Sequence, residues 1–125
     1  PYMKVKRAGY QLYSHAGKQT ALSFQLVPTL EIEGEIYLAS LSKPIPKSGV
    51  PVYLFNKQRE LVSETMSEYD GIYLFEDILP GEYTLRVDKS YLENHEFEPQ
   101  PDIKLETVGV EGVLYIEEIL LQTSP

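Results

Sequence analysis

Two histidines are the first residues in this chain whose type could bind a metal ion. His15 and His95 both fall in polar stretches, and neither has a second ligand-type residue at a metal-binding spacing such as H-x-x-x-H. A zinc site needs three or four convergent donors. We therefore interpret both as solvated loop residues and predict no metal site and no cofactor.

A group of carboxylates could form a calcium loop instead. Glu64, Glu68 and Asp70 are close in sequence, but the D-x-[DN]-x-[DN]-G run that supplies several oxygens in order is absent. Asp70-Gly71 is more simply a turn pair, because Gly71 can adopt the positive φ that tight turns require. We expect no tight calcium binding.

The residue types of a hydrolase are present without its motif. The chain contains Ser, His and Asp, but no G-x-S-x-G turn that would expose a nucleophile. We predict that the chain is not an enzyme.

Aromatic side chains offer a different chemistry, the stacking of sugar rings. The chain has ten tyrosines and no tryptophan, and Tyr37, Tyr53 and Tyr69 are expected to be exposed. Carbohydrate binding in an accessory module of a secreted protein is therefore an alternative function. Solvent-facing tyrosine on strands is the simpler interpretation, because tyrosine packs well on pleated surfaces.

Composition limits the class of protein. The length of 125 residues suits one domain, and a formal net charge of −8 argues against nucleic-acid binding, which needs a basic surface. No run approaches the ~20 apolar residues of a membrane helix, so we expect no membrane insertion by this segment. The absence of cysteine is compatible with a cytosolic or an exported bacterial protein. Since the chain begins at Pro1, we interpret it as a fragment whose leader could lie outside it.

The stretch 67–87 organises the rest of the chain. The turn pair Asp70-Gly71 opens a strand with alternating Tyr73 and Phe75, and Pro80-Gly81 precedes a second strand with a period of two. Pro80-Gly81 predicts a type II turn with Gly81 at positive φ. Further strands are expected at 9–13, 21–27, 31–38, 50–56, 60–66, 102–106 and 113–121, with one helical turn at 88–94. Residues 1–7 are interpreted as an entry linker or an edge strand.

The alternation also predicts the core, because residues two apart share one face of a strand. The inward positions are Ile32, Ile36, Leu38, Val52, Leu54, Tyr73, Phe75, Ile78, Tyr83, Leu85 and Val87. Gly34, inside a strand, suggests a bulge or a close backbone approach. Strands every 8–12 residues with turns between them predict an all-β antiparallel sandwich.

The pattern D-G-x-Y-x-F-x-x-I-x-P-G-x-Y-x-L-x-V, with the strands at 33–37 and 49–54, resembles carboxypeptidase-regulatory-like domains. It is similar also to B-type repeats of Gram-positive adhesins and to other prealbumin-like sandwiches. The resemblance implies a prealbumin-like (Ig-like) β-sandwich of about seven to nine strands and covers about residues 32–87. It departs from adhesin repeats because the strand 32–38 holds no Lys and the strand 113–122 no Asn, which removes their Lys–Asn crosslink.

Together these patterns favour a non-catalytic structural or protein-interaction module of an exported bacterial cell-envelope protein. Residues 1–30 would be an N-terminal hairpin or junction segment packed on the sandwich, and residues 31–125 the sandwich itself. A fainter resemblance, over 7–18, the strand to Val27, 33–37 and 67–71, is to segments of fimbrial usher-like outer-membrane proteins. It implies a periplasmic domain that handles pilus subunits or their chaperones. We expect a location in the periplasm, in the outer membrane or at the cell surface.

The partner would be such an envelope protein or a neighbouring domain, bound at an exposed sheet edge. The candidate edges are the strands 21–27 and 113–121. The last strand has apolar residues at both odd and even positions, which point to opposite faces. Either both faces are covered within the domain or the strand meets a partner. We name Ile119 and Leu121 as the residues of this edge, and expect them to be exposed in the isolated domain if only a partner covers them.

Overall fold

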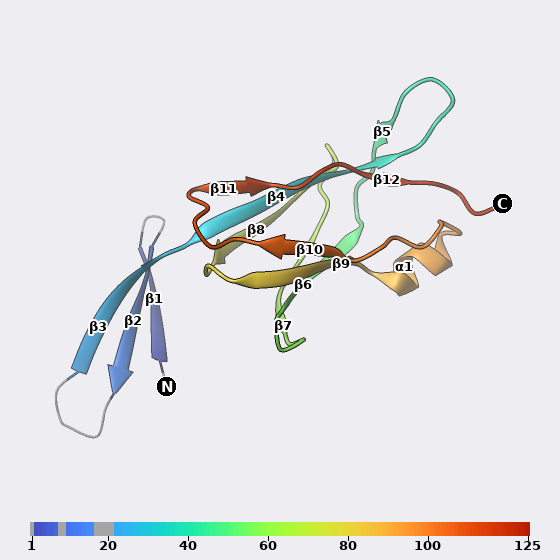
Figure 1. The fold of residues 1–125 in the computed structure, drawn as a ribbon. Helices are drawn as coiled ribbons and strands as arrows, with labels where there is room; N and C mark the ends of the chain where they lie inside the picture. The colour runs from blue at the N-terminus through green and yellow to red at the C-terminus, as the bar shows by residue number, and fades with distance from the viewer. Residues whose placement is uncertain (1, 8–9, 17–21) are drawn as a thin grey trace.

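The computed structural model describes residues 2–7, 10–16 and 22–125, with side chains from residue 27 onward. Twelve strands and one short helix are assigned in these residues (Figure 1). They are β1 (Tyr2–Arg7), β2 (Tyr10–Ala16), β3 (Leu22–Pro28), β4 (Leu30–Leu38), β5 (Ile45–Pro46), β6 (Pro51–Asn56), β7 (Leu61–Met66), β8 (Ile72–Ile78), β9 (Glu82–Val87), α1 (Lys89–Asn94), β10 (Ile103–Glu106), β11 (Val113–Tyr115) and β12 (Ile119–Leu121).

Strands β4 to β12 form two layers. One sheet has the order β10-β9-β6-β7, and the other is built around β4, which pairs with β8, β11, β12 and the short β5. The predicted β-sandwich class is confirmed, and the pairings are antiparallel except that β11 and β12 run parallel to β4.

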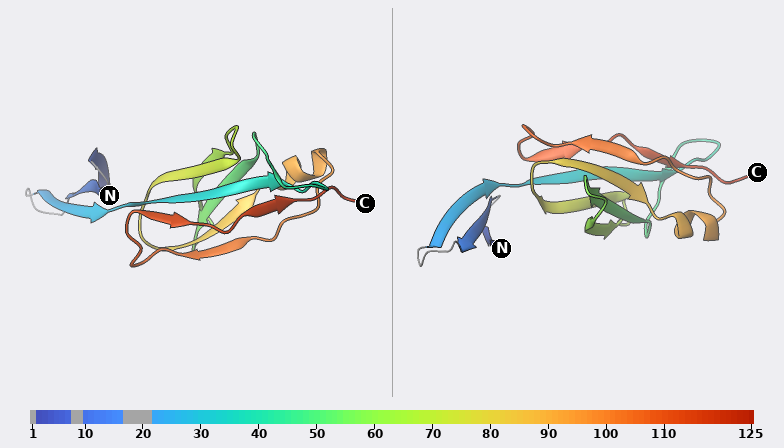
Figure 2. Two further views of the ribbon diagram at one scale, coloured as in Figure 1. Left: turned by 90° about the horizontal axis from the view of Figure 1, so that it is seen from above. Right: turned by 60° about the horizontal axis from the view of Figure 1, so that its bottom comes forward.

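The N-terminal strands form a separate antiparallel sheet in the order β1-β2-β3. Only Thr29 separates β3 from β4, so the chain passes directly from this sheet into the sandwich. Figure 2 shows the sandwich entered at one end by β4 and left at the opposite end by the C-terminus.

The core lies between the two layers and follows the predicted parity. Nine of the eleven predicted core residues are buried, and the other two, Leu38 and Tyr83, are half-buried and pack against the core. The Tyr83 hydroxyl reaches the edge of the core, where it donates a hydrogen bond of 2.6 Å to the carbonyl of Leu79.

Gly34 is the close backbone approach that its position predicted. It lies directly opposite Tyr73 in the β4–β8 ladder, and a Cβ at Gly34 would overlap the Tyr73 ring. The Tyr73 side chain is fully buried over this glycine. A ring can occupy the middle of the core here only because β4 has no side chain beneath it.

The two predicted turns have different outcomes. Gly71 has a φ of 82°, and the Asp70 carboxylate accepts a hydrogen bond of 3.1 Å from the Ile72 amide, so the turn assignment is confirmed. The prediction of positive φ at Gly81 is wrong. Thr107 holds this turn instead, because its hydroxyl accepts from the Gly81 amide at 2.8 Å and donates to the Gly81 carbonyl at 2.9 Å.

The predicted single strand 113–121 is also wrong, because it is divided into β11 and β12. Tyr115 pairs with Glu33 and Ile119 pairs with Ile36, so four steps along the last segment match three steps along β4. Because of the extra residue, even-numbered positions such as Leu114 face the core in β11, whereas the odd-numbered Ile119 and Leu121 face it in β12. This shift explains why apolar residues occupy both parities without a cover on both faces.

Candidate interaction surface

Ile119 and Leu121, the predicted edge residues, belong to the core of the isolated domain. Their exposed fractions are 5% and 0%, and they pair with Ile36 and Leu38 of β4. Exposure was expected only if a partner alone covered this strand, and the isolated domain itself covers both side chains because the extra residue between Tyr115 and Ile119 turns them inward. The other predicted edge corresponds to β3, which lies at one end of the order β1-β2-β3. Its residue Ala21, and the side chains of 22–26, lie outside what the structure describes.

The three tyrosines considered for sugar stacking do not form one platform. Tyr37 and Tyr53, which were expected to be exposed, are half-buried on the outer faces of β4 and β6, in opposite layers. Tyr69 is 87% exposed, as expected, and lies in the β7–β8 turn. A hydrogen bond to Glu35 raises the pKa of Tyr37, and partial burial together with Asp88 raises the pKa of Tyr53.

His95 is part of an aromatic stack after α1. Its ring lies 4.0 Å from the Tyr91 ring, and its Nδ1 lies 2.9 Å from the Tyr91 carbonyl oxygen. His15 lies in β2, so its prediction as a loop residue is wrong, and its side chain lies outside those described. Within the described part of the chain, no three His, Cys, Asp or Glu side chains are grouped so that they could hold a metal ion. In the same residues no helix is long and apolar enough to span a bilayer.

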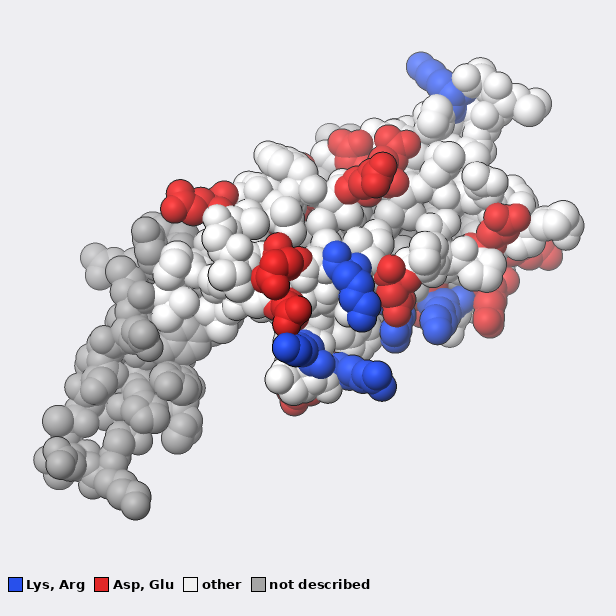
Figure 3. Space-filling model, viewed as in Figure 1, with Lys and Arg blue, Asp and Glu red and all other residues white. Residues whose placement is uncertain are grey.

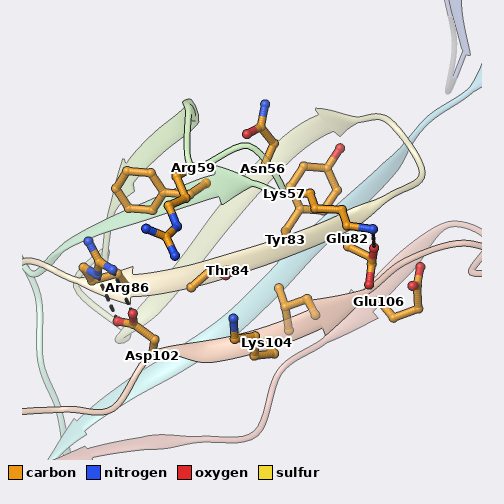
Figure 4. Close-up of a pocket in the computed structure, with 12 residues that line it drawn as sticks. Asn56, Lys57, Arg59, Glu82, Tyr83, Thr84, Arg86, Asp102, Lys104 and Glu106 are labelled. Carbon is orange, nitrogen blue, oxygen red and sulfur yellow. Dashed lines mark hydrogen bonds and ion pairs between the residues drawn. The ribbon is translucent and has the colours of Figure 1, made fainter.

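A shallow hollow lies on the outer face of the β10-β9-β6-β7 sheet, with a volume of about 790 Å³ (Figure 4). The aromatic residues that line it are Phe55 of β6 and Tyr83 of β9. The Arg86 guanidinium lies 4.9 Å from the centroid of the Phe55 ring, a cation–π distance.

Two ion pairs border this hollow. Arg86 Nε and Nη2 donate to the two carboxylate oxygens of Asp102 at 2.9 and 2.8 Å, which raises the pKa of Arg86 and lowers that of Asp102. Lys57 Nζ lies 3.0 Å from a carboxylate oxygen of Glu82, and this contact raises the pKa of Lys57. Both pairs fix a cation at a defined place.

Two further cations in the hollow, Arg59 and Lys104, form no ion pair with any described residue. Figure 4 shows them reaching toward Thr84 from different elements, Arg59 from the β6–β7 turn and Lys104 from β10. The turn that presents Arg59 is braced by Asn56, whose side-chain oxygen accepts from the Glu60 amide at 2.9 Å. Arg59 has a φ of 65°, which is uncommon for a residue with a side chain.

The hollow was missed at the sequence level because its residues come from three separate segments. No local motif joins Arg59, Thr84 and Lys104, and only the strand order β10-β9-β6 brings them together. The outward position of Phe55 on β6 was the one available signal.

The opposite layer has acidic residues without cations, whereas the β10-β9-β6-β7 layer has charges of both signs. Glu31, Glu33 and Glu35 alternate along the outer face of β4, and strands β4, β8, β11 and β12 contain no Lys or Arg. Figure 3 shows the Lys and Arg side chains gathered mainly over the lower half of the sandwich, where β9 and β10 run in Figure 1. The two faces of the sandwich therefore differ in charge.

These features define a β-sandwich module with charged residues on its outer faces. A family model described as the second beta sandwich domain of BOS complex subunit NOMO1-like proteins matches residues 30–117, so the chain belongs to this family. The carboxypeptidase-regulatory-like assignment stays a resemblance of the sequence. No curated protein matches the chain.

Several solved structures share the fold at low sequence identity. The minor pilin GBS52 of Streptococcus agalactiae aligns with a TM-score of 0.57 at 12% identity over 93% of this chain, which spans 60% of that pilin. The major pilin subunit BcpA of Bacillus cereus gives 0.58 at 12% identity over 90% of this chain and 37% of its own length. An enzyme, (S)-allantoin synthase, aligns with a TM-score of 0.50 at 10% identity over 74% of this chain and 41% of its own length. These likenesses show the fold and leave activity to be argued from the site.

Proposed function

We propose that this domain is a non-catalytic structural and protein-contact module of an exported cell-envelope protein, placed in series with other sandwich domains. The observation that carries the proposal is the path of the chain through the sandwich. The chain enters along β4 at one end and leaves at the opposite end (Figure 2), which is the arrangement needed to join domains end to end.

The comparisons support this arrangement without fixing the parent protein. The family description names a second β-sandwich domain within a subunit of a complex, which implies at least one other sandwich in such proteins. Two structural neighbours are a minor pilin and a major pilin subunit, and they support the fold of such a module. Export and a bacterial envelope location are the finer parts of the proposal, and an usher-like parent rests on the sequence resemblance alone.

The carbohydrate alternative has less support from the geometry. Sugar-stacking platforms need aromatic rings on one surface, whereas Tyr37 and Tyr53 lie on opposite layers and Tyr69 lies in a turn. The Phe55 ring in the hollow is covered by Arg86 and is not free to stack on a sugar.

The test compares the full-length parent protein with a version in which residues 30–121 are replaced by a flexible linker. Partners are recovered by affinity purification from the envelope or membrane fraction and identified by mass spectrometry. We expect at least one protein partner to be lost from the linker version. Equal recovery of all partners contradicts the proposal, and binding of the 125-residue chain to a glycan panel would favour the alternative.

A further inference from the structure

The unpaired cations of the hollow lack an anion. Arg59 and Lys104 are exposed, and Thr84 lies between them on β9 with a hydroxyl that can donate to a carboxylate. The two other cations there are already paired, Lys57 with Glu82 and Arg86 with Asp102. Glu106 also lines the hollow, which therefore has four cations and three carboxylates and can accept a further carboxylate at Arg59 and Lys104.

The outer face of β4 has carboxylates in a complementary pattern. Glu33 lies between two apolar neighbours on the same face, Leu74 of β8 and Tyr115 of β11, and Tyr115 is 71% exposed. Glu31 and Glu35 lie two residues to either side, about 6–7 Å along the strand. We call Glu31, Glu33 and Glu35 the acidic ridge.

We propose that the acidic ridge of one copy docks in the hollow of a second copy. The ridge and the hollow are on opposite layers of the sandwich, so they cannot meet within one molecule. Carboxylates of the ridge would pair with Arg59 and Lys104. The contact joins unlike surfaces, so it produces an open stack of copies and not a closed dimer.

This inference rests on the proposed contact function and identifies the partner surface. Because each copy has one ridge and one hollow, a related sandwich domain with the same two faces would dock in the same way. The contact depends on pairs of exposed charges, so it is weakened by salt.

The experiment measures self-association of the 125-residue chain by sedimentation velocity over a concentration series at low salt. We expect concentration-dependent association that weakens about tenfold when NaCl rises from about 50 to about 500 mM. One variant reverses the hollow (Arg59→Glu with Lys104→Glu), and another reverses the ridge (Glu33→Lys with Glu35→Lys). Each alone should be monomeric, because its two faces then have the same sign.

An equimolar mixture of the two variants provides the decisive result. The reversed hollow of one should accept the reversed ridge of the other, and association should return to within about threefold of wild type. The matched control, Lys43→Glu with Lys89→Glu, makes the same charge change as the hollow variant at lysines outside the hollow and should associate as wild type does.

Three results would overturn the inference. The first is a wild-type chain that stays monomeric at low salt, and the second is a reversal variant that associates as strongly as wild type. The third is a mixture that stays monomeric although circular dichroism shows that both variants are folded. Partner recovery by the full-length protein is measured separately. A monomeric chain whose parent still loses partners with the linker replacement would reject the stack and leave the contact function standing.

Discussion

The substitution Tyr73→Phe should stabilise the domain, because it removes an unpaired hydroxyl from a fully buried side chain. The Tyr73 hydroxyl is buried, and no hydrogen-bond partner for it is found in the described part of the chain. An unsatisfied buried hydroxyl costs about 1–3 kcal/mol. Removing it leaves a void of roughly 10 Å³, which costs about 0.2 kcal/mol at ~24 cal/mol per Å³. We therefore expect a gain of about 1–2 kcal/mol in the free energy of unfolding.

The pH dependence provides a second and independent readout. Burial raises the pKa of the Tyr73 phenol above the value of about 10 that it has in the unfolded chain. Above pH 10 the unfolded state loses a proton that the native state keeps, so the wild type loses stability as pH rises. The Phe variant lacks this loss, and its advantage should widen by about 1 kcal/mol between pH 10 and 11.

Urea unfolding at pH 7, 10 and 11 measures both effects, with Tyr83→Phe as the matched control. The Tyr83 hydroxyl donates to the Leu79 carbonyl at 2.6 Å, so its removal should cost about 1 kcal/mol. A Tyr73→Phe variant that is less stable than wild type by 1 kcal/mol or more would mean that the hydroxyl has a partner. The packing of Tyr73 over Gly34 would then be wrong.

Further expectations concern the core, one ion pair and metals. Gly34→Ala should cost more than about 2 kcal/mol in a urea melt, because a Cβ there overlaps the Tyr73 ring; a neutral result would contradict that packing. Phe75→Ala should cost about 3–5 kcal/mol, and a loss under about 1 kcal/mol would place Phe75 at the surface. Asp102→Asn should cost at most about 1 kcal/mol, since the pair with Arg86 is about one-third exposed. Because Arg86 lowers the folded pKa of Asp102, this difference is present above about pH 4 and should disappear as pH falls below it; a difference unchanged at pH 2 would contradict the pairing. Calcium or zinc added to the chelator-stripped chain should leave the Tm unchanged, and a shift of several degrees at sub-millimolar metal would reveal a site.

The sequence predicted the layers and most of the core because period-two alternation is local. Ile32, Leu54 and Phe75 are buried as the alternation requires, and Gly34 makes the close approach that a glycine inside a strand suggested. These positions depend on neighbours within one strand, so a single sequence contains the needed signal.

The failures have a shared cause, which is contact between distant segments. Thr107 lies 26 residues beyond Gly81 and decides the conformation of that turn through two hydrogen bonds. The position of the extra residue between Tyr115 and Ile119 is visible only in the pairing with β4. The hollow likewise depends on strand order, so the sequence alone pointed to buried residues at 119 and 121 as the contact.

Whether the domain works by protein contact is tested most directly by cross-linking the full-length protein in its native envelope or membrane fraction. The lysines on the described surface, above all Lys57 and Lys104 beside the hollow, are the reporters. A contact function predicts cross-links from these lysines to other sandwich domains or to other proteins. Cross-links confined to residues within this domain, from a preparation in which other proteins of the fraction do cross-link, would contradict it.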